Sequence, residues 1–366
     1  MSRILLVCPW FYPAWKSGGT ALAAYNTAKI YVKLGHRVDV FTTRENGDEV
    51  LSVKGKVLHQ GISVHYFSYL PLYKGAAWSP TLLFTLCRKA CDYDVICIHG
   101  VRNAYELLLL LMHRIGLLNA KIFVTPHAAW RKDWIEEIGN SFLVRLYQRV
   151  ITKFTRHVIC QYLSEDEKRD SPKIYDSDII TPNYINAIKV SNSERNQSYY
   201  LMLCRVHPQK AIERAISLIR DNKTKVLHIY GPFDDHKYYE LLVNRIESLG
   251  LSERIYFKGS YDNDELALIL SKYSAIVFSS HVEGVSMAML EALSSGLPVI
   301  YSEGVGNRDI LVKYMPETRV VNWEHTVQIV KAVDARWKDF SSTSMKVFEN
   351  EYSERAVMEK WKRHIS

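Results

Sequence analysis

The sequence contains no long apolar run. The longest uninterrupted one, Leu107–Met112, is far shorter than the roughly 20 residues that a membrane-spanning helix needs. The N-terminus, MSRILLVCPWF, passes from a single arginine directly into a strand-like apolar stretch, without the apolar region and cleavage site of a signal peptide. We therefore expect a cytoplasmic protein, either soluble or peripheral at the inner face of the cell membrane.

Two further absences exclude whole classes of protein. The chain has no low-complexity tract, and its 48% hydrophobic and 23% charged residues are ordinary for a globular protein, which excludes disorder as its main character. None of the cysteines forms a CxxC pair, so we expect reduced structural thiols rather than a cysteine metal site. The six are Cys8, Cys87, Cys91, Cys97, Cys160 and Cys204.

The chain carries a positive excess, with a formal net charge of +8 and a pI of about 9.0. Such an excess fits nucleic acid, an anionic membrane surface or an anionic substrate, and charge alone does not choose among them. No RNA-binding aromatic signature accompanies it. The length of 366 residues is about twice that of a usual single domain, which predicts two domains.

Strand and helix patterns alternate through the first half. RILLVC, residues 3–8, is typical of a buried strand, and ALAAYNTAKIYVKLG has helical spacing that ends at Gly35. Further strands are predicted at HRVDVFTT, YDVICIHG, AKIFVTPH and RHVICQY. This alternation predicts an open parallel α/β sheet.

A second alternating block follows the polar segment IKVSNSERNQS, residues 188–198, where we place the linker. Its predicted strands are YYLMLCRV, KVLHIYG, RIYFKGS, SAIVFSS and PVIYS. We thus predict two Rossmann-like doubly wound domains, residues 1–187 and 188–345, that leave a cleft between them. Residues 346–366 are helical in composition and are expected to return to the first domain. Their apolar positions are Val347, Tyr352, Val357 and Trp361.

Two glutamates are prominent in SSHVEGVSMAMLEALSSGLPVI, residues 279–300. Glu283 follows a predicted buried strand, so it lies at the edge where ligands bind in open α/β sheets. Glu291 comes one to two turns into a largely apolar helix, where an anion is costly unless it has partners such as ribose hydroxyls. Read alone, each also fits a solvated helical carboxylate or an acid favoured by the helix dipole.

Cations and glycines follow other strands. LCRVHPQK places Arg205 and Lys210 at a strand end, where two cations beside the helix N-terminus near residues 285–287 suit a diphosphate. In the first half, Gly18 and Gly19 open a helix and let the backbone approach an anion, and VTPHAAW puts His127 at a strand end. Surface cations and a structural histidine are the simpler alternatives.

Together these motifs resemble the retaining family 4 (group 1) nucleotide-sugar glycosyltransferases of the GT-B fold. The resemblance covers nearly the whole chain. It runs from RILLVCPWFYPAWKSGGTALAAYNTAKIYVKLGHRVDVFTT through ICIHG, VTPHA and LCRVHPQKA to EGVSMAMLEALSSGLPVI. Each motif is moderately specific alone, and their order and spacing make the combination strong. The family carries two glutamates separated by seven residues, as Glu283 and Glu291 are.

The resemblance implies a role for each position. Glu283 would hold hydroxyls of the transferred sugar, and Glu291 would hold the ribose of the nucleotide. Arg205 and Lys210 would bind the diphosphate, and His127 would lie near the donor sugar. The remaining positions are the acceptor-side loop at Gly18 and Gly19, and a donor-binding backbone at Gly231, Gly284, Val285, Ser286 and Met287.

The resemblance also implies the ligands. The donor would be a UDP- or GDP-sugar, with no further cofactor. The acceptor would be a glycan, expected to be linked to polyprenyl diphosphate in the synthesis of a surface polysaccharide such as O-antigen, capsule or exopolysaccharide. Anomeric configuration would be retained.

Some positions depart from the family pattern. Cys204-Arg205 and Lys210-Ala211 stand where the family usually has Gly-Arg and Lys-Gly, and Ser286 stands where it often has a second glycine. The acids DND, residues 262–264, and DSD, residues 176–178, look like metal ligands of the other glycosyltransferase fold. Because helix-cap preference accounts for Asp262 or Asp264, we predict no essential metal.

Two other functions stay open. One is a nucleotide-sugar epimerase or a phosphorylase-type enzyme on the same fold. The other is a non-catalytic protein that binds nucleotide sugars or nucleic acid.

The stretch WRKDWIEEIGNSFLVRLYQRVITKFTRHV, residues 130–158, combines a periodic apolar face with a basic run. Such a helix suits an anionic membrane surface, whereas a core-packed helix with solvated cations is the alternative. The apolar positions are Trp134, Ile138, Phe142, Leu146 and Val150, and the basic ones are Arg145, Arg149, Lys153 and Arg156.

Overall fold

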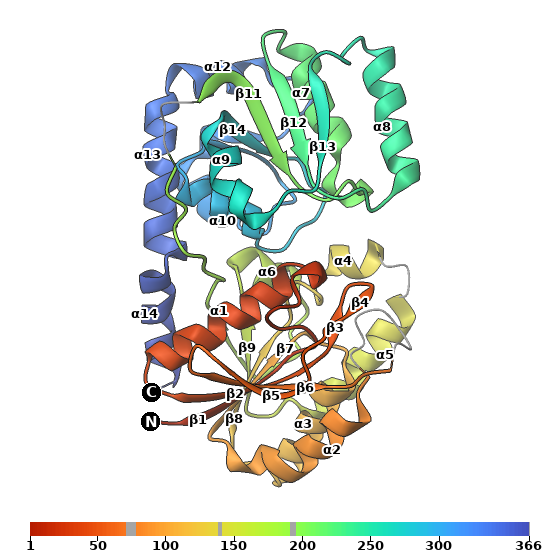
Figure 1. The fold of residues 1–366 in the computed structure, drawn as a ribbon, viewed down its shortest axis with the longest axis vertical. Helices are drawn as coiled ribbons and strands as arrows, with labels where there is room; N and C mark the ends of the chain where they lie inside the picture. The colour runs from red at the N-terminus through yellow and green to blue at the C-terminus, as the bar shows by residue number, and fades with distance from the viewer. Residues whose placement is uncertain (71–77, 138–140, 191–194, 366) are drawn as a thin grey trace. The chain divides into compact units, whose positions relative to one another are not determined.

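The computed structural model describes residues 1–70, 78–137, 141–190 and 195–365. The chain forms two compact units: unit 1 comprises residues 1–184 and 357–366, and unit 2 comprises residues 185–356. Each unit is built on a mainly parallel sheet with helices around it (Figure 1). The predicted class of two doubly wound α/β domains is confirmed.

Unit 1 contains an eight-stranded sheet in the order β10-β9-β8-β7-β1-β2-β6-β5. All neighbouring strands are parallel except β5, which pairs antiparallel with β6. The strands are β1 (Arg3–Val7), β2 (Arg37–Thr43), β5 (Gly55–His59), β6 (Ile62–Phe67), β7 (Val95–His99), β8 (Lys121–Thr125), β9 (Val158–Tyr162) and β10 (Ser177–Ile180). A small hairpin joins β3 (Glu45–Asn46) and β4 (Glu49–Val50).

Both faces of this sheet are covered. Along β1, Ile4 and Leu6 pack into the cluster that contains residues of α1 (Gly19–Lys33) and α14 (Glu354–Ile365), whereas Leu5 and Val7 pack with α2 and α3. The alternation follows from the two-residue side-chain period of a strand, and it explains why the central strands are apolar throughout. The helices are α1 (Gly19–Lys33), α2 (Pro80–Lys89), α3 (Ala104–Arg114), α4 (Lys132–Glu137), α5 (Ser141–Ile151) and α6 (Glu165–Asp170).

Unit 2 contains a six-stranded parallel sheet in the order β13-β12-β11-β14-β15-β16. The first strand begins at Asn196, three residues before the apolar pattern that predicted it. The strands are β11 (Asn196–Leu203), β12 (Val226–Tyr230), β13 (Ile255–Gly259), β14 (Tyr273–Phe278), β15 (Val299–Ser302) and β16 (Arg319–Val320). The helices are α7 (Ile212–Asp221), α8 (His236–Ser248), α9 (Leu266–Ser271), α10 (Met287–Ser294), α11 (Arg308–Tyr314), α12 (Val327–Ala335) and α13 (Trp337–Val347).

The C-terminal stretch is helical, as its composition predicts. A π-helical turn, Phe348–Tyr352, follows α13 and leads into α14 (Glu354–Ile365). Val347 and Tyr352 belong to the core of unit 2. Val357 and Trp361 belong to the core of unit 1, where the Trp361 ring lies edge-on to Phe123.

Helical residues occupy much of the stretch from residue 130 to 158. The structure places α4 and α5 within it, followed by a short 3-10 turn at Thr152–Phe154. Its two end residues, Trp130 and Val158, are buried. The predicted apolar positions whose exposure the structure describes, Phe142, Leu146 and Val150, lie exposed on α5. Ile138 and the Trp134 side chain lie outside the described residues.

The acids that look like metal ligands have structural partners. Asp262 caps the 3-10 turn Asn263–Glu265 that precedes α9, and its backbone N–H donates to Glu265 at 3.0 Å. Asp176 accepts a hydrogen bond from the backbone N–H of His157 at 2.8 Å, and Asp178 pairs with Lys168 at 2.5 Å. All six cysteines are free thiols, and Cys87 and Cys91 are exposed rather than in the core.

Candidate functional site

The carboxyl edge of the unit 2 sheet gathers the predicted donor-site residues. Arg205 and Lys210 follow β11, and Glu283 follows β14, the strand directly beside β11. Because both strands are parallel, their C-terminal loops emerge at the same edge of the sheet. Side chains 78 positions apart in sequence, Arg205 and Glu283, can therefore serve one ligand.

Lys210 and Glu283 form an ion pair, with Nζ 2.5 Å from Oε1. The two side chains are only 14% and 13% exposed. The second carboxylate oxygen of Glu283 accepts a hydrogen bond from Ser280 Oγ at 2.9 Å. Desolvating two charges is costly and is offset only by good geometry, so this pair holds an ammonium and a carboxylate at defined positions in the loops.

Arg205 has a different carboxylate partner. Its Nη1 lies 2.5 Å from Oδ2 of Asp234, a residue that the sequence analysis did not identify. Half of the Arg205 side chain is exposed, so the pair is solvated and contributes little to stability. The guanidinium is thus held beside the site and is accessible to a diphosphate.

A second missed residue, Gln209, joins the two loops. It is buried within the HPQK motif, and its side-chain amide donates to the backbone carbonyl of Val282 at 2.9 Å. The Gln209 carbonyl accepts from the backbone N–H of His281 at 2.9 Å. Its place directly before the predicted Lys210 is the one sequence signal for this residue, and that signal does not reveal its contact with Val282.

Glu291 lies on α10, where burial raises the pKa of its carboxyl to about 7. Desolvation of the carboxylate is the cause of that shift. The helix begins at Met287 with Ser286 as its N-cap, and the first helical hydrogen bond runs from Leu290 N–H to the Ser286 carbonyl. The N–H groups of the first turn are thus available to an anion.

Two glycines that were not predicted, Gly304 and Gly306, pack directly against the loop that carries Glu283. A Cβ on Gly304 would lie 2.0 Å from the carbonyl oxygen of His281, and one on Gly306 would lie 2.5 Å from that of Glu283. The backbone N–H of Glu283 donates to the Gly304 carbonyl at 2.8 Å. The sequence EGVGN after β15 is therefore a packing motif for the site.

Gly231 lies at the end of β12 in a conformation that only glycine adopts readily. Its φ is +143°, and a Cβ would lie 1.9 Å from the carbonyl oxygen of Cys204, directly before Arg205. Glycine is therefore required at position 231 because two strand ends pass close to each other there. The predicted contact of Gly231 with the donor stays a prediction.

Gly231→Ala is expected to destabilise unit 2 by roughly 3 kcal/mol or more, because backbone rather than a flexible side chain must move. Urea unfolding measures the effect. Gly250→Ala is the matched control: Gly250 also has a positive φ, +65°, but has nothing within 4 Å of its Cβ position. It should cost only about 1–2 kcal/mol. Equal losses in the two variants would contradict the close-approach argument.

Two positions that depart from the family pattern, Ala211 and Ser286, lie at the N-termini of helices. Ala211, which replaces a usual glycine, has φ 46° and ψ 50°, the left-handed conformation that glycine adopts most easily. Ser286 occupies the N-cap of α10 without a side-chain capping bond. Ala211 therefore has an unfavourable backbone conformation in the loop that carries Lys210.

In unit 1, Gly18 and Gly19 form an exposed start to α1. Gly18 has φ +85°, and its Cβ position has no atom within 4 Å, so conformation rather than space requires glycine there. The same loop carries Trp15, whose exposed ring lies edge-on to Tyr12 and Tyr25. An exposed glycine loop flanked by aromatic rings suits a sugar-containing ligand.

His127 lies two residues beyond β8 and is half-buried. Its backbone has φ 53°, and the next residue, Ala128, has φ 65°. The N–H of Ala128 donates to the buried carboxylate of Glu167 at 2.6 Å. Two consecutive left-handed non-glycine residues are strained, and such strain clusters at functional sites.

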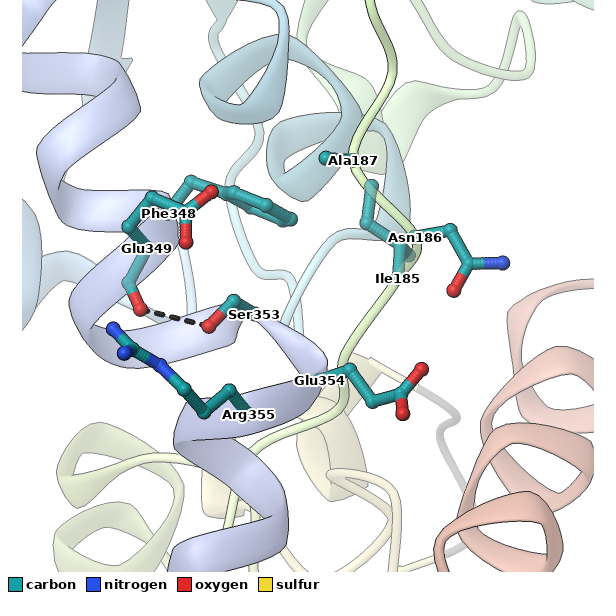
Figure 2. A pocket seen from close by; sticks show the side chains of 8 residues that line it. All are labelled: Ile185, Asn186, Ala187, Phe348, Glu349, Ser353, Glu354 and Arg355. Atoms are coloured by element: carbon teal, nitrogen blue, oxygen red, sulfur yellow. Dashed lines mark hydrogen bonds between the residues drawn. The ribbon is translucent and has the colours of Figure 1, made fainter. Parts of the chain in front are cut away.

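A separate pocket of about 340 Å³ lies in unit 2 beside the π-helical turn. Figure 2 shows its lining: Ile185, Asn186, Ala187, Phe348, Glu349, Ser353, Glu354 and Arg355. Ser353 Oγ donates to the carbonyl of Glu349 at 2.8 Å across the turn. None of the predicted donor-site residues lines this pocket, so it is not part of the candidate site.

Two family models together match most of the chain. Residues 184–360, which carry the Arg205, Lys210 and Glu283 loops, match the glycosyl transferases group 1. Residues 17–173, which carry Gly18 and His127, match glycosyltransferase family 4. The chain belongs to the family 4, group 1 glycosyltransferases. The family resemblance of the sequence motifs is thereby confirmed.

Two curated relatives of this glycosyltransferase show low identity to it. An uncharacterised glycosyltransferase of Methanocaldococcus jannaschii is 22% identical over 333 residues, 82% of this chain and 81% of its own length. The O-antigen chain mannosyltransferase RfbU of Salmonella typhimurium is 25% identical over 177 residues, 45% of this chain and 48% of its own.

Solved structures share the fold of the whole chain. Anabaena HepE in complex with UDP matches with a TM-score of 0.75 at 15% identity, covering 99% of both chains. Sucrose-phosphate synthase of Thermosynechococcus elongatus matches with a TM-score of 0.75 at 15% identity, covering 99% of this chain and 98% of its own. These likenesses establish the GT-B fold.

Proposed function

We propose that the protein transfers a hexose from a UDP- or GDP-sugar to a hydroxyl of a glycan, with retention of anomeric configuration. The observation that carries the proposal is the Lys210–Glu283 pair at the carboxyl edge of the unit 2 sheet. It holds a cation for a diphosphate beside a carboxylate for sugar hydroxyls. Arg205 and the first turn of α10 add positive potential to the same loops.

The proposed reaction breaks the bond between the anomeric carbon and the diphosphate oxygen, and forms one to the acceptor oxygen on the same face. Arg205, Lys210 and the α10 N-terminus stabilise the charge that develops on the leaving diphosphate. The acceptor proton passes to an oxygen of the β-phosphate. A protein nucleophile is then not required. Glu283 binds hydroxyls of the sugar, Glu291 binds the ribose, and His127 lies near the donor sugar.

A panel of nucleotide sugars tests the donor class. The correct donor should raise the melting temperature of the protein, because a ligand that binds only the folded state stabilises it. Sugar release should require a glycan acceptor. Epimer formation without an acceptor would favour the epimerase alternative. Donor binding without turnover on any acceptor would favour a binding protein.

We propose a lipid-linked acceptor in the synthesis of a surface polysaccharide, O-antigen, capsule or exopolysaccharide. The likeness to the Salmonella O-antigen chain mannosyltransferase supports this class of acceptor over 45% of the chain. A polyprenyl diphosphate linked to an oligosaccharide would bring the acceptor to a membrane surface, so the protein would work at the cytoplasmic face.

Chelation should leave activity unchanged, since cationic side chains and a helix end would neutralise the leaving diphosphate without a metal ion. Transfer is measured with excess EDTA and with added magnesium or manganese. Full loss in EDTA that manganese restores would contradict the metal-independent mechanism.

The membrane part of the proposal rests on α5. Its inward side carries Val144, Tyr147 and Ile151, and the Tyr147 hydroxyl donates to the buried Glu106 at 2.9 Å. Its outward side exposes four apolar residues: Phe142, Leu143, Leu146 and Val150. Exposed cations accompany them, namely Arg145, Arg149 and Lys153. In the described part of the chain, no helix is long and apolar enough to cross a membrane.

Anionic liposomes should bind the protein at low salt and release it as salt rises. Each basic residue near the surface contributes about 1 kcal/mol, so the Arg145/Arg149/Lys153 triple alanine variant should lose roughly 100-fold in affinity. Phe142→Ser/Leu146→Ser should also weaken binding, by removing apolar contact with the bilayer. Co-sedimentation measures both.

The matched control is the Lys54/Lys56/Lys89 triple alanine variant. It removes three exposed cations of unit 1 that lie outside residues 141–154, and so has the same net charge as the Arg145/Arg149/Lys153 variant. Equal loss of liposome binding in both would show a nonspecific charge effect. A wild-type protein that ignores anionic liposomes at low salt would contradict the peripheral-membrane proposal.

A further inference from the structure

His127 has a partner that the sequence analysis did not identify. His99 is the last residue of β7 and is 1% exposed. Its Nδ1 lies 3.0 Å from Nε2 of His127, within hydrogen-bond distance. The strands β7 and β8 are parallel neighbours, with His99 in register with Thr125. Two strand ends in the same sheet thus bring the two rings together.

Both rings are neutral in the folded protein. Burial lowers the pKa of His127 to about 4. Burial, and then the nearness of His127, lower the pKa of His99 well below its ordinary value. Each neutral imidazole carries one proton, so one ring must donate and the other must accept.

The direction of the bond follows from the other nitrogen of His99. His99 Nε2 is buried and has no hydrogen-bond partner among the described residues. A proton there would be an orphaned N–H in the interior, which is rarer in proteins than an unsatisfied acceptor. The proton of His99 therefore belongs on Nδ1, from which it is donated to His127 Nε2. His127 in turn keeps its own proton on Nδ1.

The surroundings hold this arrangement in place. The Tyr105 hydroxyl donates to the His99 carbonyl at 2.9 Å, and Asn103 Nδ2 donates to that hydroxyl at 3.0 Å. On the other side, the Ala128–Glu167 hydrogen bond fixes the left-handed backbone next to His127. Both rings are therefore attached to backbone segments with little freedom to turn.

We propose that His99 is a positioning residue that locks His127 in the Nδ1–H tautomer, so that His127 is a neutral hydrogen-bond donor and not a base. The lone pair of His127 Nε2 is occupied by His99, and the Nδ1–H is left for a ligand. The ligand of this N–H would be a hydroxyl of the transferred sugar, and that part of the inference rests on the proposed function.

The tautomer is measured directly by long-range proton–nitrogen NMR on protein with ¹⁵N-labelled histidine. His127 is assigned from the spectrum of His127→Gln. The expected result is a protonated Nδ1 and an unprotonated Nε2 for His127 in the wild-type protein at neutral pH. A protonated Nε2 on His127 would overturn the proposal. The measurement needs no sugar substrate, so failure to find transferase activity would refute the proposed function and leave this result unaffected.

Variants of His99 test the consequence for turnover. His99→Phe should release His127 into a mixture of tautomers and lower kcat by about tenfold, the loss expected for one hydrogen bond, with KM for the donor little changed. His99→Asn should keep the wild-type tautomer of His127 and wild-type turnover, unlike His99→Phe. The asparagine amide nitrogen lies near the position of the His99 Nδ1 and can donate the same hydrogen bond. His99→Gln, with its amide one bond farther out, should not.

Two controls complete the experiment. His325→Phe replaces an exposed histidine and should change neither the His127 signals nor turnover. Thermal unfolding shows whether each variant folds. If His99→Phe does not fold, the tautomer measured in the wild-type protein still decides the proposal. Equal turnover in folded Phe, Asn and Gln variants would overturn the positioning role.

Discussion

Arg205→Ala and Lys210→Ala should each lower turnover by at least about 100-fold. Removing one donor that acts on developing charge typically costs around 3 kcal/mol, and these two cations are proposed to stabilise the leaving diphosphate. Steady-state transfer assays with the donor found in the nucleotide-sugar panel measure the loss. The matched controls are Lys223→Ala and Lys237→Ala, which remove exposed cations of unit 2 from outside the candidate site. Near-normal turnover in folded Arg205 and Lys210 variants would remove both residues from the mechanism.

The two variants should differ in stability. Arg205 is half exposed and pairs with Asp234 at the surface, so its removal should cost no more than about 1 kcal/mol. Lys210→Ala leaves the nearly buried Glu283 without its cation, and should cost about 3–5 kcal/mol. The double variant Lys210→Ala/Glu283→Ala should recover much of that stability and none of the activity. This comparison separates a folding defect from a catalytic one.

The grouping of the candidate donor-site residues was largely predictable because parallel strands end at a common edge. Arg205 and Glu283 each follow an apolar run that is recognisable as a buried strand, and β11 and β14 are adjacent in the sheet. The cost of an anion in the apolar Glu291 helix was likewise visible in the sequence, and the raised pKa of its carboxyl expresses that cost. Roles for all these residues still rest on the family resemblance.

The contacts between loops could not be predicted in this way. Asp234 reaches Arg205 and Gln209 reaches Val282 across irregular segments, where no periodicity defines which residues meet. Gly304 and Gly306 are needed because another backbone segment passes so close that a Cβ atom would clash with its carbonyl oxygens. The sequence alone does not reveal this close approach. His99 reads as an ordinary strand residue, and only the pairing of β7 with β8 reveals its contact with His127.

The apolar spacing of residues 130–158 predicted a surface helix, and α5 exposes such an apolar face. Both Trp130 and Val158, at the ends of this stretch, are taken into the core of unit 1. Periodicity identifies an amphipathic face, but it cannot say which face the rest of the domain covers.

Glu283→Ala and Glu291→Ala are expected to separate transfer from binding. Ribose belongs to the nucleotide, so Glu291→Ala should weaken binding of free nucleoside diphosphate by roughly tenfold or more, as for a lost hydrogen bond to a charged group. Glu283→Ala should leave that affinity nearly unchanged and lower transfer instead. Calorimetry with the diphosphate and transfer assays with the intact donor measure the two effects. The reverse order would contradict the assigned roles.

The pH dependence of binding gives Glu291 a sharper test. Burial raises its pKa to about 7, so the carboxyl is largely protonated in the free protein at about pH 6. Ribose hydroxyls donate to the ionised form, and binding should therefore release a proton and strengthen as the pH rises through about 7. The phosphate groups of the ligand also titrate near pH 6, and they affect binding to the wild type and to Glu291→Gln equally. The difference in pH dependence between the two proteins therefore reports the Glu291 carboxyl alone.

Folding stability should show the opposite trend for the same group. The ordinary pKa of 4.5 applies to the unfolded chain, and the folded value is raised to about 7. The protonated carboxyl therefore favours the folded state below about pH 4.5, and that stability is lost as the pH rises to about 7. Glu291→Gln cannot ionise, so it should exceed the wild type in stability at about pH 8, by up to about 3 kcal/mol. Urea unfolding at both ends of this range measures the difference, and identical pH profiles for folding and for diphosphate binding in the two proteins would mean that Glu291 is neither desolvated nor at the ribose.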